Sequence, residues 1–92
     1  ALHASILVAE DHPVNQQLVR RLLTRLGHRV EIAADGGAAV AAFARDRFDL
    51  VFLDVQMPEV DGLEAARRIR ALEAGTRHTP LIALTAHAMD RD

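Results

Sequence analysis

The sequence contains no cysteine, no lysine and only three aromatic residues, all phenylalanine. Without cysteine, disulfides, thiol catalysis and cysteine-ligated metals are excluded. No apolar run approaches the roughly 20 residues that span a bilayer, and no basic stretch followed by an apolar core begins the chain. The net charge of −2 provides no basic footprint for nucleic acid or for a membrane surface. We therefore expect a cytoplasmic domain that contacts neither nucleic acid nor membrane directly.

Apolar segments alternate between strand-like and helix-like patterns along the 92 residues, of which 50% are hydrophobic. Short apolar runs predict strands, and longer segments with an apolar stripe predict helices. Pro13 suits the first position of a helix, and Gly27 suits the left-handed position that follows one. We predict strands over 5–10, 29–34, 49–53 and 81–84, and helices over 13–26, 37–47 and 62–74. Alternating strands and helices with nearly continuous apolar strands predict one α/β domain, a parallel sheet covered on both faces.

Each predicted helix has an apolar stripe. In the first helix, arginines lie opposite this stripe, as in an amphipathic surface helix. The predicted stripes are Leu18, Leu22 and Leu26 with Val19 and Leu23, then Val40, Phe43 and Ala44, and finally Leu63, Ala66, Ile69 and Leu72.

Polar residues follow three of the four predicted strands directly. The first strand runs into Glu10 and Asp11, the third into Asp54 and the fourth into Thr85. In an open parallel sheet, ligands bind beyond the carboxyl ends of the strands, at the point where strand order reverses. If these strands are neighbours, the four side chains converge on one pocket.

Three carboxylates in one pocket repel each other, so such a cluster requires a cation. Oxygen ligands without histidine or cysteine suit a hard ion such as Mg²⁺. A carboxylate can also be the nucleophile in phosphoryl transfer, and a hydroxyl such as that of Thr85 can hydrogen-bond the incoming group. For any one aspartate, a helix cap at Asp11 or an Asx-turn at Asp54 is the simpler interpretation. Agreement among three strand ends favours a site.

Three stretches of this sequence resemble response-regulator receiver domains: "ILVAEDHPVN", "LVFLDVQMPEVDGLEAARRIR" and "TPLIALTAHAM". The resemblance covers residues 5–92 and leaves residues 1–4 as a linker. It is strongest to receivers of hybrid sensor histidine kinases. It implies a flavodoxin-like doubly wound sheet with strand order 2-1-3-4-5.

The resemblance also implies a role for each polar residue at the strand ends. Asp54 would accept a phosphoryl group from the phosphohistidine of a histidine kinase or a histidine phosphotransfer protein, and the domain would slowly dephosphorylate itself. Asp11, Asp54 and the backbone carbonyl of Gln56 would hold Mg²⁺, with Mn²⁺ as a substitute, and Glu10 would contribute through water. Thr85 would hydrogen-bond the phosphoryl oxygen and move on activation. We predict that Gln56 and His87 tune the lifetime of the aspartyl phosphate.

The sequence departs from the family at its C-terminal end. The family's fold continues with a fifth strand, which ends in a lysine that pairs with the phosphoryl group, and a last helix. This chain has no lysine. We therefore expect a C-terminally truncated receiver, cytoplasmic or tethered to a membrane-bound kinase, whose open sheet edge allows dimerisation.

The sequence leaves two other functions possible as alternatives. An aspartate-nucleophile phosphatase would need an aspartate two residues after the nucleophile, where this chain has Gln56. A pseudo-receiver would keep the fold as an interaction module without phosphorylation, which the missing lysine favours and the intact acidic residues oppose.

Overall fold

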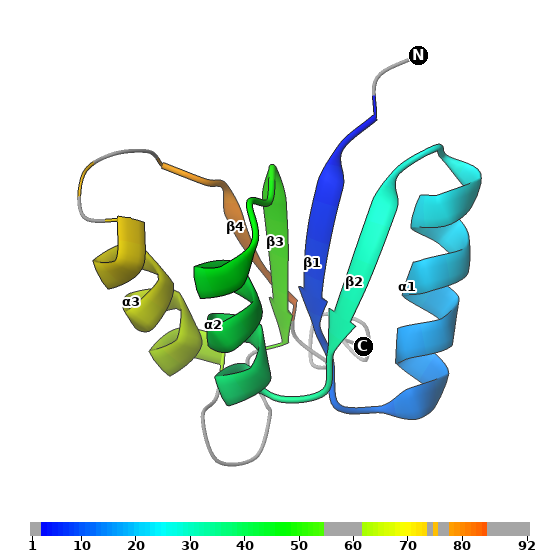
Figure 1. The fold of residues 1–92 in the computed structure, drawn as a ribbon. Helices are drawn as coiled ribbons and strands as arrows, with labels where there is room; N and C mark the ends of the chain where they lie inside the picture. Colours follow the sequence, from blue (N-terminus) through cyan, green and yellow to red (C-terminus); the bar gives the residue numbers. More distant parts are fainter. Residues whose placement is uncertain (1–2, 55–61, 74, 76–77, 85–92) are drawn as a thin grey trace, which may run out of the picture.

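The computed structural model describes residues 3–54, 62–73, 75 and 78–84 (Figure 1). The predicted elements are confirmed, and their bounds agree with the sequence prediction to within two residues. In chain order they are β1 (Ser5–Ala9), α1 (Pro13–Arg25), β2 (Arg29–Ala33), α2 (Gly36–Arg45), β3 (Leu50–Asp54), α3 (Gly62–Glu73) and β4 (Leu81–Leu84). Pro13 opens α1, and Gly27 follows it with φ of 95°.

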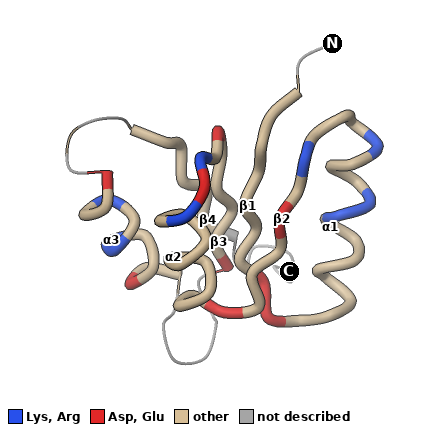
Figure 2. The backbone as a smooth tube through the Cα atoms, in the orientation of Figure 1, with Lys and Arg blue, Asp and Glu red and all other residues tan. Residues whose placement is uncertain are grey.

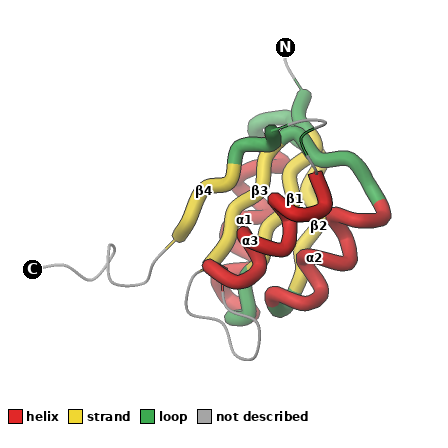
Figure 3. The backbone as a smooth tube through the Cα atoms, turned by 90° about the vertical axis from the view of Figure 1, so that its left-hand side faces the viewer, coloured by secondary structure: helices red, strands yellow, loops and turns green. Residues whose placement is uncertain are grey.

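The four strands form one parallel sheet in the order β2-β1-β3-β4, as the family resemblance implies. The strand order reverses at β1, because β2 lies on one side of it and β3 on the other. A right-handed crossover then places α1 and α2 on opposite faces of the sheet. Figure 3 shows α2 and α3 together on one face and α1 on the other.

The main core lies between the sheet and the pair α2 and α3. Alternate residues of β1 and β3 point into it, and small residues let the two helices approach the strands closely. Phe48 closes the core where α2 connects to β3, and its ring stacks on Phe43 at 6.5 Å between centroids. The fully covered side chains of this core are Leu7, Ala9, Val51 and Leu53 from the strands and Ala39, Ala65 and Ile69 from the helices.

The predicted apolar stripe of α1 faces the sheet only in part. Leu18, Leu22 and Leu26 are 64%, 58% and 61% exposed, whereas Val19 and Leu23 are half-buried. The reason is that α1 contacts chiefly β2 in the described part of the chain, so only one narrow side of the helix is covered. The four-residue repeat therefore identified an amphipathic helix, but the three leucines that define the repeat lie on its exposed side.

The predicted inward faces of α2 and α3 are confirmed only in part: in α3, Ile69 is buried and Ala66 packs at the margin of the core, as predicted. In α3, Leu63 and Leu72 are exposed, and the buried residues are Gly62, Ala65, Ile69 and Glu73. In α2, the buried residues are Gly36, Ala39 and Ala42, while Val40 and Phe43 pack at the margin and Ala44 is exposed. Close packing against the sheet favours small side chains, so glycine and alanine occupy all the buried positions of α2 and the first two of α3.

A buried carboxylate connects the end of α3 to the start of β4. Glu73 is 5% exposed, and its Oε2 accepts a hydrogen bond from the backbone N–H of Thr79 at 2.6 Å. Its Oε1 accepts one from Arg70 at 2.8 Å, and the same guanidinium donates to the Thr79 carbonyl oxygen at 2.8 Å. These bonds fix the segment that enters β4.

Candidate metal-binding site

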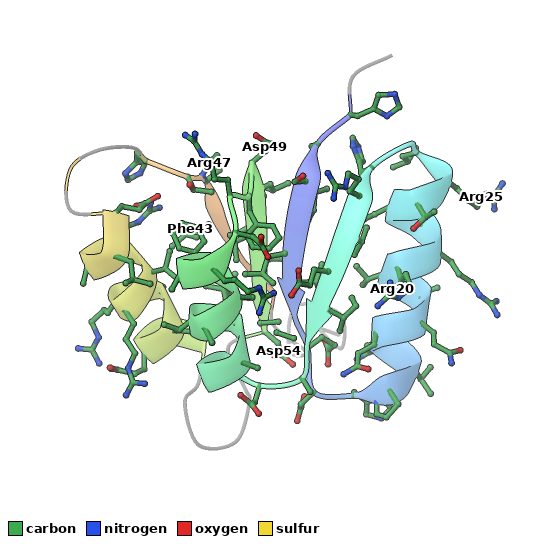
Figure 4. The ribbon with its side chains drawn as sticks, in the orientation of Figure 1. Arg20, Arg25, Phe43, Arg47, Asp49 and Asp54 are labelled. Carbon is green, nitrogen blue, oxygen red and sulfur yellow. The ribbon has the colours of Figure 1, made fainter. Side chains whose placement is uncertain are left out.

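The register of the sheet brings the acidic strand ends together. Ala9 pairs with Leu53, so Glu10 after β1 lies beside Asp54 at the end of β3. One carboxylate oxygen each from Glu10, Asp11 and Asp54 lie within 4.8 Å of one another. Figure 4 shows Asp54 at the carboxyl end of the strands, and Figure 2 shows acidic residues gathered at this end of the sheet. The predicted convergence of these three residues is therefore confirmed.

Glu10 is the buried member of the cluster, at 5% exposure. Its backbone is held by two bonds: its N–H donates to the Ala33 carbonyl at 2.9 Å, and its carbonyl oxygen accepts from the Gln16 side chain at 2.6 Å. Its carboxylate accepts a hydrogen bond from the backbone N–H of His12 at 3.0 Å. The side chain is thus fixed in the site.

The pKa of the Glu10 carboxyl is raised above its ordinary value. Burial is the largest cause, and the negative charges of Asp54 and Asp11 act in the same direction. Hydrogen bonds from the His12 N–H and the Asn15 side chain lower the pKa but do not cancel the increase. The raised pKa therefore reflects mainly the burial of the carboxyl, with smaller contributions from the two neighbouring negative charges.

Asp11 and Asp54 lie at the more accessible side of the cluster, exposed and half-buried respectively. The simpler interpretation of Asp11 as a helix cap is wrong, because His12 is the N-cap residue of α1 and no side chain caps that helix. An aspartate does cap α2: the Asp35 carboxylate accepts from the Ala38 N–H at 2.7 Å.

The three carboxylates fit a hard divalent cation. All three ligand atoms are oxygen, the group contains no histidine or cysteine, and Asp11 opens to solvent. Mg²⁺ commonly takes one or two protein carboxylates together with waters and phosphate oxygens. A dication would also relieve the mutual repulsion among the three carboxylates.

The other predicted site residues, Gln56, Thr85 and His87, lie outside the described residues, and their roles stay predictions. The structure adds supporting residues that the sequence reasoning missed. Gln16 and Asn15 contact Glu10 from the first turn of α1, although neither was assigned a role. The available signal was two consecutive amides shortly after the acidic pair, in a first turn without acidic residues.

Comparison with known proteins identifies this arrangement. The family model described as "Response regulator receiver domain" matches residues 6–92. This chain belongs to the receiver domain family. Among curated relatives, it is 46% identical over 86 residues to the sensor protein GacS of Pseudomonas syringae pv. syringae, which covers 91% of this chain and 10% of that protein. It is 43% identical over 93 residues to hybrid signal transduction histidine kinase I of Dictyostelium discoideum, covering 95% of this chain and 5% of that protein.

Solved receiver structures share the fold. The receiver domain of a sensor histidine kinase from Pseudomonas aeruginosa PAO1 matches with a TM-score of 0.86 and 45% identity, over 99% of this receiver and 74% of that chain. That structure has a magnesium ion coordinated in its active site cleft. The receiver domain of the histidine kinase CKI1 from Arabidopsis thaliana, complexed with Mg²⁺ and BeF₃⁻, matches with a TM-score of 0.83 and 30% identity over 91% of this receiver and 66% of that chain.

This receiver spans only 5% and 10% of the length of the two curated relatives named above. Within the described part of the chain, no helix has both the length and the apolar composition needed to cross a membrane.

Proposed function

We propose that this receiver is the phosphoacceptor in a His-Asp phosphorelay and that Asp54 takes the phosphoryl group in an Mg²⁺-dependent reaction. The observation that supports this proposal is the cluster of Glu10, Asp11 and Asp54 at the carboxyl edge of the sheet. Asp54 terminates β3 and remains half-exposed, so a donor can reach it, while the buried Glu10 beside it has no such access.

The reaction transfers one phosphoryl group between two side chains. A carboxylate oxygen of Asp54 attacks the phosphorus, the new O–P bond forms, and the P–N bond to the donor histidine breaks. The bonding electron pair returns to the imidazole nitrogen, and an aspartyl phosphate results. Asp11, Asp54 and the carbonyl oxygen of Gln56 would hold Mg²⁺, with Glu10 acting through water. When bound, Mg²⁺ neutralises charge on the transferred group and on the carboxylates.

The surrounding residues prepare Asp54 for this step. The backbone bonds to Ala33 and Gln16 hold Glu10 in place, and the Glu10 charge lies within 4.8 Å of the reacting carboxylate. The repulsion between these like charges favours the binding of a cation in the cluster. Thr85 would donate a hydrogen bond to a phosphoryl oxygen of the product and act as the switch.

Gln56 and His87 are proposed to tune the lifetime of the aspartyl phosphate, because each lies two residues beyond a reacting position. Gln56→Ala and His87→Ala are expected to change the dephosphorylation rate, measured from the decay of the phosphorylated form after the donor is removed. Decay at the rate of the unsubstituted receiver in both variants would contradict this role.

The phosphodonor is proposed to be a histidine kinase or a histidine phosphotransfer protein, in keeping with the similarity to hybrid kinases. A second candidate function is that of a pseudo-receiver, an interaction module that does not accept a phosphoryl group.

An intact mass spectrum before and after incubation with Mg²⁺ and a small acyl-phosphate donor tests the proposal. We expect the mass of one phosphoryl group to be added to the receiver and to the Asp35→Asn control, but not to Asp54→Asn. Omission of Mg²⁺ should abolish the addition. Mg²⁺ binding without any mass increase would support the pseudo-receiver, and turnover of a phosphate ester would support a phosphatase.

A further inference from the structure

A second polar pocket lies at the end of the sheet opposite the acidic cluster. Its volume is about 240 Å³, and it is lined by the first residues of β1 and β2 and by the connection from α2 to β3. Figure 4 shows Arg47 and Asp49 of this connection at one end of the strands and Asp54 at the other. The pocket therefore shares no residue with the proposed phosphorylation site.

The acidic side chains around this pocket already have partners. The Arg45 guanidinium at the end of α2 binds Glu31 Oε2 at 2.5 Å and Asp46 Oδ2 at 2.9 Å. The carboxylate of Asp49 accepts a hydrogen bond from the backbone N–H of Ser5 at 2.8 Å. These acids therefore have less capacity to bind the other cations that line the pocket.

Two arginines line the same pocket without an ion pair in the described part of the chain. Arg29 at the start of β2 and Arg47 before β3 are both exposed. A guanidinium presents donors in a planar fork that matches the oxygens of a carboxylate or phosphate. By contrast, Arg67, Arg68 and Arg70 of α3 are paired with glutamates of their own helix.

The remaining walls favour a small ligand. Phe48, at 5% exposure, and the half-buried Val30 line the pocket together with the arginines and add apolar surface to it. Ordinary pockets for drug-sized ligands begin at about 300 Å³, so a volume of about 240 Å³ suits an anion of a few heavy atoms.

We propose that this pocket binds a small anion, either a phosphate or a carboxylate, through the guanidinium groups of Arg29 and Arg47. The site is distinct from the proposed phosphoacceptor site and does not depend on phosphorylation of Asp54. A phosphate and a carboxylate present the same charged oxygens to the two forks, so separate titrations must distinguish them.

The test is a titration of the ¹⁵N-labelled receiver with inorganic phosphate and, separately, with malonate, at ionic strength held constant with NaCl. We expect saturable shifts of the amide signals of Arg29, Val30, Arg47 and Phe48 with at least one of the two anions. Saturation by phosphate alone, or by malonate alone, identifies the ligand class. Small, linear shifts with both anions would overturn the proposal.

Matched double variants test the two arginines. Arg29→Ala with Arg47→Ala is expected to weaken binding by about tenfold or more, because both charged hydrogen-bonding groups are lost. Arg20→Ala with Arg25→Ala removes the same charge from exposed positions of α1, which Figure 4 shows away from the pocket, and should leave binding unchanged. Equal weakening in both double variants would mean nonspecific charge attraction. Asp54→Asn should bind the anion as the unsubstituted receiver does, so this test stands apart from the phosphorylation test.

Discussion

Replacement of Asp54 by asparagine is expected to stabilise the metal-free receiver and to remove most of the stabilisation that Mg²⁺ provides. The change keeps the shape of the side chain but removes one of three negative charges within 4.8 Å of one another. Asparagine is also a weaker ligand for Mg²⁺ than a carboxylate. The two effects have opposite signs, so one pair of measurements separates them.

The size of the first effect follows from Coulomb's law. Two charges 4.8 Å apart repel by about 0.9 kcal/mol at the dielectric constant of water, and by about 3.5 kcal/mol at an effective value of 20. Asp11 is exposed and Asp54 half-buried, so their repulsion lies near the lower figure. Summed over both neighbours and reduced by salt screening, the expected gain in unfolding free energy is about 1–2 kcal/mol.

The second effect follows from linkage. A cation that binds only the folded state at 100 times its dissociation constant stabilises that state by about 2.7 kcal/mol. Urea denaturation in EDTA and in excess MgCl₂, at ionic strength matched with NaCl, measures both quantities. In EDTA the Asp54→Asn variant should unfold at higher urea than the receiver, and MgCl₂ should shift the receiver far more than the variant.

Asp35→Asn is the matched control, because it makes the same chemical change outside the cluster and asparagine caps a helix as well as aspartate does. It should respond to MgCl₂ as the receiver does. A metal-free Asp54→Asn variant no more stable than the receiver would show that repulsion is not significant in the folded cluster. Equal Mg²⁺ stabilisation of receiver and variant would refute the assignment of Asp54 as a ligand.

Three further substitutions test the packing and hydrogen bonding that support the site. Burial raises the pKa of Glu73, but the hydrogen bonds from Thr79 and Arg70 outweigh it and hold the pKa below its ordinary value of 4.5. Glu73→Gln should therefore lower the unfolding free energy by about 1–3 kcal/mol at neutral pH, and the deficit should shrink as urea midpoints are measured below pH 4.5, where the receiver itself loses the charge. Asp35→Ala should lower the unfolding free energy, measured by chemical denaturation, by about 1 kcal/mol because it removes the cap of α2. An equal loss in Asp35→Asn would contradict this role of the side chain. Ile69→Ala should lower the thermal midpoint sharply, with a loss of about 2–5 kcal/mol in unfolding free energy. Leu18→Ala, at an exposed position, should change the unfolding free energy by about 0.5 kcal/mol or less. A reversed order would support the sequence prediction that Leu18 belongs to the buried stripe of α1.

The order of elements and the place of the site followed from local sequence patterns. Apolar runs and helical periodicity located each strand and helix of the described residues, because both signals depend on neighbouring residues alone. The acidic ends of the first and third strands were equally visible. A general rule of parallel sheets then sufficed to bring Glu10, Asp11 and Asp54 together.

The helix faces and the state of each site residue were decided by tertiary packing. Leu18, Leu22 and Leu26 have the spacing of a buried stripe, yet what covers a helix depends on which strand it crosses. Likewise, the raised pKa of Glu10 arises from burial and from Asp54, which is 44 residues away in sequence (54 − 10). The sequence alone thus determined which residues end the strands. Only the folded sheet determined how deeply each carboxylate is buried and which groups hold it, because those quantities depend on contacts between distant segments.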